Sequence, residues 1–139
     1  MLTLANTLKE NMEQTKYYKL DHYLDIIQNY NDTDWKDYEV YNRDHYNKTL
    51  AVSNEYFNIY VVTWKPNQGT LKHGHLKNGC LLKILKGTIT ETRYLNNGDC
   101  ECMNYIEGEC TYIDDDIGLH KMVNRSGRNV VSIHIYPPS

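Results

Sequence analysis

The sequence predicts a mainly β protein of one domain, in which a barrel or sandwich of short strands follows a small N-terminal helical cap. From residue 46 onward, apolar and polar side chains alternate with the period of two that is typical of strands. Turn residues such as Asn-Gly and Pro-Asn separate these runs, and many short strands joined by turns indicate a sandwich or a barrel. Residues 1–45 instead repeat apolar side chains at helical spacing, so we expect a helical cap within the same domain as residues 46–139.

Three helical segments are expected in this cap. Leu4, Leu8 and Met12 recur at helical spacing, a second stripe occupies residues 23–30, and a short third helix is expected over residues 35–41. The strands that follow are expected at residues 46–53, 56–64, 70–75, 80–86, 88–95, 101–106, 110–114, 118–124 and 129–136.

Length, charge and cysteine content restrict the class of protein. With 139 residues, the chain is long enough to bury one core. A net charge of −3 at pH 7, with Lys and Arg scattered among acidic residues, argues against a nucleic-acid partner. No apolar run approaches the roughly 18 residues that span a bilayer, and the N-terminus lacks the apolar core of a signal peptide. We therefore expect a soluble, cytoplasmic monomer with no membrane partner, whose four cysteines are free thiols.

A pair of histidines is the strongest functional signal in the chain. His73 and His75 are two residues apart, so on a strand both imidazoles would leave the same face and could reach one cation. Cys80 opens an apolar, alternating run that is expected to be a half-buried strand returning beneath the first. His120 can supply a third imidazole, and an open site with three protein ligands leaves positions for a substrate. Imidazole nitrogens suit zinc, copper, iron and nickel.

The spacing of these residues resembles a known motif. Histidine, any residue, histidine, four residues to Cys80 and six more to a glycine is the pattern of the first cupin motif, in which a glutamate usually occupies the position of Cys80. Residues 64–87, 110–124 and 132–138 together resemble cysteine dioxygenase, the thiol dioxygenase branch of the cupins. The resemblance implies a cupin jelly-roll barrel for residues 46–139.

The resemblance also implies a cofactor and a reaction. It implies one ferrous iron per chain, held by His73, His75 and His120. Because no Asp or Glu stands at position 80, three neutral imidazoles would replace the common set of two histidines and one carboxylate. The implied activity is that of an oxidoreductase that adds both atoms of O2 to a thiol, converting L-cysteine to cysteine sulfinic acid. The expected partners are therefore a small thiol and O2.

Two further groups of residues gain a role from this resemblance. Cys80 and Tyr136 occupy the positions at which cysteine dioxygenases of the animal type form a thioether beside the iron. Ser132, His134 and Tyr136 alternate along one expected strand and so share a face. Buried polar side chains are normally hydrogen-bonded, so a row of three indicates a structural or functional role. The resemblance implies that hydroxyl, imidazole and phenol form a catalytic relay directed at the metal.

The carboxylate of the substrate is the point at which the sequence departs from the family pattern. A weaker match aligns Tyr46-Asn-Lys48 with the family's tyrosine, any residue, arginine, so Lys48 stands where an arginine normally holds the carboxylate of cysteine. Arginine offers a planar fork for two parallel hydrogen bonds, whereas lysine offers a compact point charge on a flexible stem. We expect Lys48 and Tyr46 to bind the carboxylate; with a shifted register, Arg43 would take this role.

The residues alone leave other functions open. The three histidines could hold zinc in a non-catalytic metal-binding cupin, and the oxidised thiol could be cysteamine or 3-mercaptopropionate. A redox- or metal-sensing domain could use Cys100, Cys102 and Cys110, although C-x-C is a poorer zinc spacing than C-x2-C. Cys100 and Cys102 are expected on an exposed hairpin, and His22 and His45 are expected to be surface residues outside any site.

Overall fold

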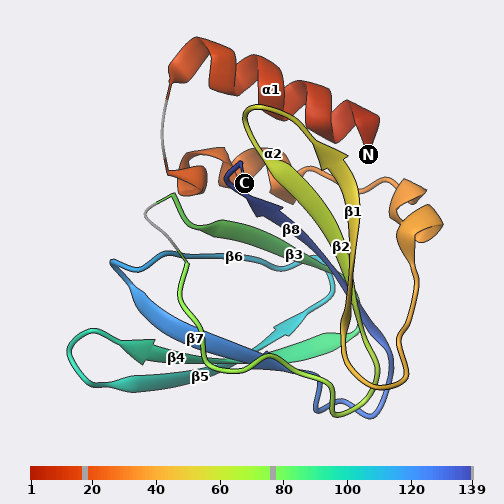
Figure 1. The fold of residues 1–139 in the computed structure, drawn as a ribbon, viewed down its shortest axis with the longest axis vertical. Helices are drawn as coiled ribbons and strands as arrows, with labels where there is room; N and C mark the ends of the chain where they lie inside the picture. The colour runs from red at the N-terminus through yellow and green to blue at the C-terminus, as the bar shows by residue number, and fades with distance from the viewer. Residues whose placement is uncertain (17–18, 76–77, 139) are drawn as a thin grey trace.

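The structure, a computed structural model, describes residues 1–16, 19–75 and 78–138 (Figure 1). Within them, the helices are confined to the N-terminal part, and the rest of the chain folds into antiparallel strands and the loops between them. This confirms the expected mainly β class with an N-terminal helical cap. No described helix is both long enough and apolar enough to cross a lipid bilayer.

The three expected helical segments are present, but two of them differ in length from the prediction. Leu4, Leu8 and Met12 of the first helix are buried, as their spacing predicts. The third segment ends at Tyr38 rather than at residue 41, because Glu39 has φ −80° and ψ 85°, outside the helical region. The helices are α1 (Leu2–Thr15), a 3₁₀ helix (Leu20–Tyr23) that continues into α2 (Leu24–Gln28), and a second 3₁₀ helix (Asp34–Tyr38).

The strands form two antiparallel sheets. They are β1 (Asn47–Ser53), β2 (Asn58–Trp64), β3 (Cys80–Lys86), β4 (Thr88–Leu95), β5 (Cys100–Ile106), β6 (Cys110–Ile113), β7 (Gly118–Val123) and β8 (Val130–Tyr136). The larger sheet has the strand order β1-β2-β8-β3-β6, and the smaller sheet has the order β5-β4-β7. In Figure 1 the helices lie over the outer side of the larger sheet, and the smaller sheet faces its inner side.

Alternation along the strands of the larger sheet produces two apolar clusters. Outward side chains such as Ile59 and Leu81 pack with residues of the helices, including Leu8. Inward side chains such as Leu82 pack with residues of the smaller sheet, including Met122. Because the burial of apolar surface is the main favourable contribution to folding, both interfaces stabilise the fold. The inner cluster also supports the pocket described below.

Lys83 connects the helical cap to β3. Its buried ammonium donates to the carbonyl oxygens of Gln28, at 2.8 Å, and Tyr30, at 2.6 Å, where α2 ends. Carbonyl oxygens at the end of a helix carry partial negative charge, so a cation is favourable there. This contact and the shared outer cluster support the prediction that residues 1–45 belong to the same domain as residues 46–139, which stays a prediction.

The prediction of a strand at residues 70–75 is wrong. Instead, two residues in 69–75 form isolated bridges to β7, Gly69 with Val123 and His73 with His120. At Gly69 an added Cβ would lie 2.7 Å from the backbone oxygen of Met122, so the segment approaches β7 too closely there for a side chain. The bridge at His73 consists of two backbone hydrogen bonds of 2.9 Å to His120. These bridges place His73 beside His120 without regular strand geometry.

Residues 80–86 form a strand, as predicted, but the strand is more deeply buried than expected and pairs with other strands. These residues form β3, but both faces are buried and only Lys86 is exposed, because the helical cap covers the face that we expected to meet water. In the sheet, β3 pairs with β8 and β6, so it does not return beneath residues 70–75.

Candidate metal centre

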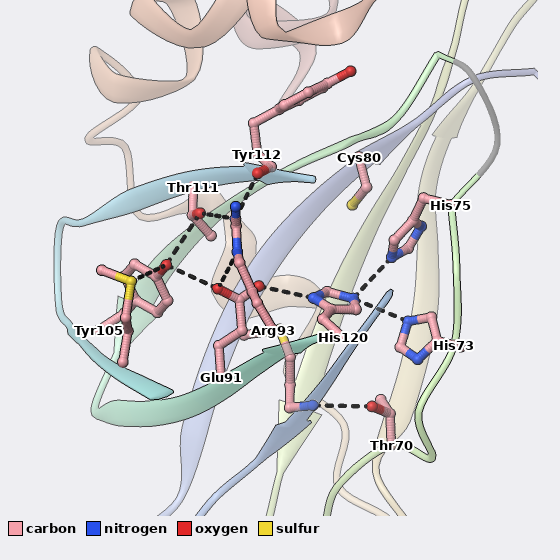
Figure 2. Close-up of polar contacts among 12 residues, drawn as sticks. Thr70, His73, His75, Cys80, Glu91, Arg93, Tyr105, Thr111, Tyr112 and His120 are labelled. Atoms are coloured by element: carbon pink, nitrogen blue, oxygen red, sulfur yellow. Dashed lines mark hydrogen bonds and ion pairs between the residues drawn. The ribbon is translucent and has the colours of Figure 1, made fainter. Parts of the chain in front are cut away.

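Three histidines converge from two separate segments (Figure 2). His73 and His75 come from the irregular segment before β3, and His120 comes from β7. The Nε2 atom of His120 lies 2.9 Å from Nε2 of His75 and 3.1 Å from Nε2 of His73. In the part of the chain that the structure describes, this is the one group of three or more ligand side chains gathered closely enough to hold an ion.

Hydrogen-bond partners determine which nitrogen of His73 and His120 faces the centre of the group. His73 Nδ1 lies 2.7 Å from the carbonyl oxygen of Leu71, and His120 Nδ1 lies 2.8 Å from Oε2 of Glu91. A carbonyl and a carboxylate only accept, so each Nδ1 carries a hydrogen and each Nε2 presents a lone pair. Two lone pairs 3.1 Å apart cannot hydrogen-bond to each other, but both can bind one cation. The donor set therefore fits a metal ion that prefers imidazole, such as iron, zinc, copper or nickel.

The electrostatic surroundings favour the neutral imidazoles of His73 and His75. Burial, together with the neighbouring histidines and Lys48, lowers the pKa of His75 to about 3. Burial also lowers the pKa of His73, against the opposing effect of its hydrogen bond to Leu71. Because a histidine must be neutral to bind a metal, protons compete weakly for these two ligands near neutral pH.

A pocket of about 580 Å³ opens onto the three histidines. Its lining includes five of the other predicted site residues, which are Tyr46, Lys48, Cys80, His134 and Tyr136. Ser132 is fully buried behind this lining, whereas Arg43 is exposed and lies outside it. The geometry therefore brings the predicted residues together, apart from Arg43.

The polar row on β8 forms a continuous chain of hydrogen bonds. Ser132 Oγ lies 2.8 Å from His134 Nε2, and His134 Nδ1 lies 3.1 Å from the hydroxyl of Tyr136. Trp64 Nε1 donates to Ser132 Oγ at 3.0 Å. An indole N–H can only donate, so Ser132 Oγ accepts from Trp64, and its own hydrogen is available to His134 Nε2. With Ser132 as the donor, the hydrogen of the neutral imidazole is on Nδ1, which donates to the oxygen of Tyr136. The hydrogen of the Tyr136 hydroxyl is then free to be donated to Cys80 or to a molecule in the pocket.

Trp64 belongs to this row of hydrogen bonds, and sequence reasoning did not identify it. Its partner Ser132 is 68 residues away in the sequence, and β2 and β8 become neighbours only in the folded sheet. No local pattern signals such a contact.

Burial, followed by the nearby charge of Lys48, lowers the pKa of His134 well below its ordinary value. The imidazole between Ser132 and Tyr136 is therefore neutral.

Cys80 and Tyr136, the two side chains that the resemblance joins covalently, are neighbours. Both line the same pocket, and each shifts the pKa of the other. Burial raises the pKa of Cys80 to about 12, although Tyr136 and Lys48 oppose this effect. Burial and the charge of an ionised Cys80 raise the pKa of Tyr136 as well. Both groups are therefore protonated near neutral pH.

Lys48 projects from β1 over two aromatic rings of the pocket wall. Its Nζ lies 4.5 Å from the centroid of the Tyr60 ring and 4.6 Å from that of Tyr136. The side chain keeps access to solvent through the open pocket, and partial burial lowers the pKa of its ammonium. Tyr46 stacks on Trp64, with ring centroids 4.9 Å apart, and lines the same pocket. A substrate carboxylate in this pocket could therefore meet a cation and a phenol.

Glu91 is a second residue of the site that sequence reasoning did not identify. It lies on β4, is fully buried, and accepts hydrogen bonds from His120 and Arg93. Burial alone would raise the pKa of Glu91, but these partners hold it below its ordinary value. The sequence contained one signal, an acidic residue in the middle of an expected strand. It did not identify the partner, because His120 lies 29 residues further along the chain.

The remaining cysteines and histidines lie outside this centre. All four cysteines are free, as expected; Cys100 and Cys102 are exposed on β5, and Cys110 lies on β6. Among the described residues, none of these thiols belongs to a group of three ligands that could hold an ion. His22 and His45 are exposed, as expected.

Comparisons of the sequence point to one family. The family described as Cysteine dioxygenase type I matches residues 3–139. The chain is 31% identical to human cysteine dioxygenase type 1 over 115 residues and 32% identical to the bovine protein over 117 residues. These alignments cover 76% and 78% of this chain and 58% of each relative, so the chain spans less than two thirds of the length of these relatives.

Solved structures share the fold at low sequence identity. A protein from Thermus thermophilus has a TM-score of 0.66 and 17% identity, covering 78% of this chain and 98% of that one. A cupin superfamily protein from Desulfitobacterium hafniense has a TM-score of 0.57 and 9% identity, covering 70% of this chain and 82% of that one. These similarities confirm the expected cupin fold. With a family match that spans nearly all of its residues and relatives of this identity, the chain belongs to the cysteine dioxygenase type I family.

Proposed function

We propose that the chain is a thiol dioxygenase that holds one ferrous iron through His73, His75 and His120 and converts L-cysteine to cysteine sulfinic acid. The observation that carries this proposal is the convergence of three Nε2 atoms beside an open pocket, in a member of the cysteine dioxygenase type I family. Ferrous iron, when bound, would supply the centre at which the thiol and O2 react, with both oxygen atoms ending on sulfur and no external reductant.

In this proposal, Lys48 and Tyr46 bind the carboxylate of the substrate. Both line the pocket that contains the histidines, and the ammonium of Lys48, which is reached by solvent through the open pocket, can attract a carboxylate that enters there. Lysine provides one flexible point of attachment, so it fixes the orientation of the carboxylate less well than the arginine of the family pattern. We therefore expect L-cysteine to remain the best substrate, with a KM that is high for the family.

The row on β8 would position a proton donor. Trp64 and Ser132 fix the orientation of the His134 imidazole, whose Nδ1–H then holds the oxygen of Tyr136 as an acceptor. The hydrogen of the Tyr136 hydroxyl is thereby available to a group in the pocket. Tyr136 has a raised pKa and so stays protonated, which suits a group that donates a hydrogen bond to oxygen or sulfur as negative charge develops there.

The proposal includes a thioether between Cys80 and Tyr136. Forming this bond removes one hydrogen from the thiol and one from the ring, and the two electrons released require an oxidant, which O2 supplies during turnover. The placement of both side chains in one pocket, where each shifts the pKa of the other, supports the proposal, since sulfur and phenol are neighbours before any reaction. The raised pKa of Cys80 is consistent with a thiol that persists until turnover begins.

Oxygen uptake with a panel of thiols tests this function. Protein loaded with ferrous iron should consume about one O2 for each thiol oxidised and form a sulfinate, most efficiently with L-cysteine among L-cysteine, cysteamine and 3-mercaptopropionate. Protein loaded with zinc serves as the control and should consume none. Preference for another thiol would correct the substrate alone. Absence of thiol-dependent uptake in protein that holds stoichiometric iron would favour a non-catalytic metal-binding cupin.

A further inference from the structure

The carboxylate of Glu91 is hydrogen-bonded to His120, one of the three histidines of the metal centre. In the antiparallel pairing of β4 with β7, Glu91 lies opposite Met122 and Arg93 lies opposite His120. Residues two apart on a strand share a face, so Glu91, Arg93 and His120 all point into the space between the sheets. Figure 2 shows Glu91 on the side of His120 that faces away from His73 and His75.

Each oxygen of the Glu91 carboxylate has its own partners. Oε2 accepts from His120 Nδ1 at 2.8 Å. Oε1 accepts from Arg93 Nε at 2.8 Å and from the hydroxyl of Tyr105 at 2.9 Å. A fully buried carboxylate is costly unless it is paired and hydrogen-bonded, and these contacts meet that requirement.

Arg93 is itself held in place from β6, in the other sheet. Its Nη2 donates to the hydroxyl of Thr111 at 2.7 Å and to the carbonyl oxygen of Tyr112 at 2.5 Å. The hydroxyl of Tyr105 also contacts Thr111, at 3.2 Å. One carboxylate oxygen is thus fixed by a network that reaches β6, and the other is directed at His120. A purely structural ion pair would not require the contact to His120.

We propose that Glu91 is a positioning residue of the metal centre, which holds the hydrogen of His120 on Nδ1 and supplies, through that imidazole, the negative charge that Cys80 leaves out of the ligand set. The inference rests on the proposed function only in that it needs a metal ion on the three histidines. Arg93 and Tyr105 hold the carboxylate in place. The charge that the common cupin motif places on the metal itself is here located one hydrogen bond away from it.

Two physical consequences follow. A carboxylate that accepts from the far nitrogen of an imidazole makes the metal-binding nitrogen a stronger donor, and loss of such a partner typically weakens metal binding about 10- to 100-fold. Negative charge close to a metal also stabilises its more highly charged, oxidised state, so removing the charge raises the reduction potential. Neither quantity requires turnover for its measurement.

The Glu91→Gln variant separates charge from shape. Glutamine keeps the size of the side chain and can still accept from His120 through its amide oxygen, but it carries no charge. We expect cobalt(II) affinity, measured by competition with a chelator, to fall about 10- to 100-fold. We also expect the reduction potential of the iron-loaded protein to rise. Affinity within about twofold of the wild type, together with an unchanged potential, would overturn the inference.

Two further variants test whether Glu91 acts on the metal or only pairs with Arg93. Tyr105→Phe removes one hydrogen bond to Oε1 but keeps the charge and the bond to His120, so its affinity should fall much less, and its potential rise much less, than those of Glu91→Gln. Glu91→Gln combined with Arg93→Gln removes both charges, which avoids an unpaired buried guanidinium. The double variant should bind cobalt(II) as weakly as Glu91→Gln; recovery of wild-type affinity would assign Glu91 a structural role and overturn the inference.

The wild-type measurement separates this inference from the proposed function. If the wild-type chain binds neither cobalt(II) nor iron, the proposed function fails, and the inference fails with it. If the wild type binds both ions and the Glu91 variants match it, the inference alone fails. Thermal unfolding of each metal-free variant shows that a weaker affinity is not the result of an unfolded chain.

Discussion

The ammonium nitrogen of Lys48 lies 4.6 Å from the centroid of the Tyr136 ring, so the cation proposed for the substrate carboxylate contacts the phenol proposed as a proton donor. The contact brings β1 and β8 together at the pocket, with β2 between them in the sheet. A thiol substrate whose carboxylate reaches Lys48 would therefore lie beside Tyr136.

Replacement of Lys48 by Ala should lower kcat/KM for L-cysteine by about 1.5–3 kcal/mol, the range for a hydrogen bond to a charged group. Cysteamine has no carboxylate, so its kcat/KM should fall much less. Steady-state kinetics with both thiols measure the difference. Equal losses on the two thiols would contradict the role of Lys48, and a selective loss on L-cysteine in Arg43→Ala instead would assign the carboxylate to Arg43.

Turnover should join Cys80 to Tyr136. Intact mass of the iron-loaded protein after turnover with L-cysteine and O2 should fall by the mass of two hydrogen atoms, and peptide mapping should locate the loss in a peptide pair that contains both residues. The Cys80→Ser variant lacks the sulfur and should keep its full mass. A free Cys80 thiol after many turnovers would disprove the crosslink while leaving dioxygenation possible.

The bond from Trp64 to Ser132 should contribute measurably to stability. Trp64→Phe removes the indole donor, and Ser132→Ala removes its acceptor together with the bond to His134; loss of each hydrogen bond costs roughly 1 kcal/mol in the free energy of unfolding. Since both variants break the same bond, the double variant should lose less than the sum of the two single losses. Denaturant unfolding of the four proteins measures this coupling, and strict additivity would show that the bond contributes nothing.

The buried imidazole of His134 should make stability depend on pH. Its pKa is lowered in the folded protein, chiefly by burial, so the unfolded chain binds the proton more readily. The contribution of neutral His134 to the free energy of unfolding is therefore complete above about pH 6.5, the ordinary pKa of histidine. As the pH is lowered below this value, the free energy of unfolding decreases by up to about 1.4 kcal/mol per pH unit. In urea unfolding of the metal-free protein, His134→Gln should show a shallower slope below about pH 6.5 than the wild type, and equal slopes in the two proteins would contradict this contribution.

The sequence predicted the parts of the fold that depend on local pattern. The alternation in residues 80–86 and 130–136 was sufficient to identify β3 and β8, because side-chain period is a property of neighbouring residues. It could not predict that both faces of β3 are buried, since that depends on helices more than fifty residues away in the chain, such as α1 (Leu2–Thr15).

The same distinction applies to the site. His73, His75 and His120 were recognisable because their spacing resembles a family pattern, even though residues 70–75 do not form the strand that we assumed. Glu91 and Trp64 were missed, since their roles depend on partners brought close only by sheet pairing. The cytoplasmic location and the monomeric state stay predictions, because no contact within one chain bears on either.

The iron content of the loaded and desalted protein tests the central claim most directly. Wild-type protein should retain about one iron per chain, and His120→Ala should retain little, because three imidazoles are needed for a stable site. The matched variant His22→Ala changes an exposed histidine outside the centre and should retain as much iron as the wild type. Full retention of iron by His120→Ala would contradict the assignment of the metal to His73, His75 and His120.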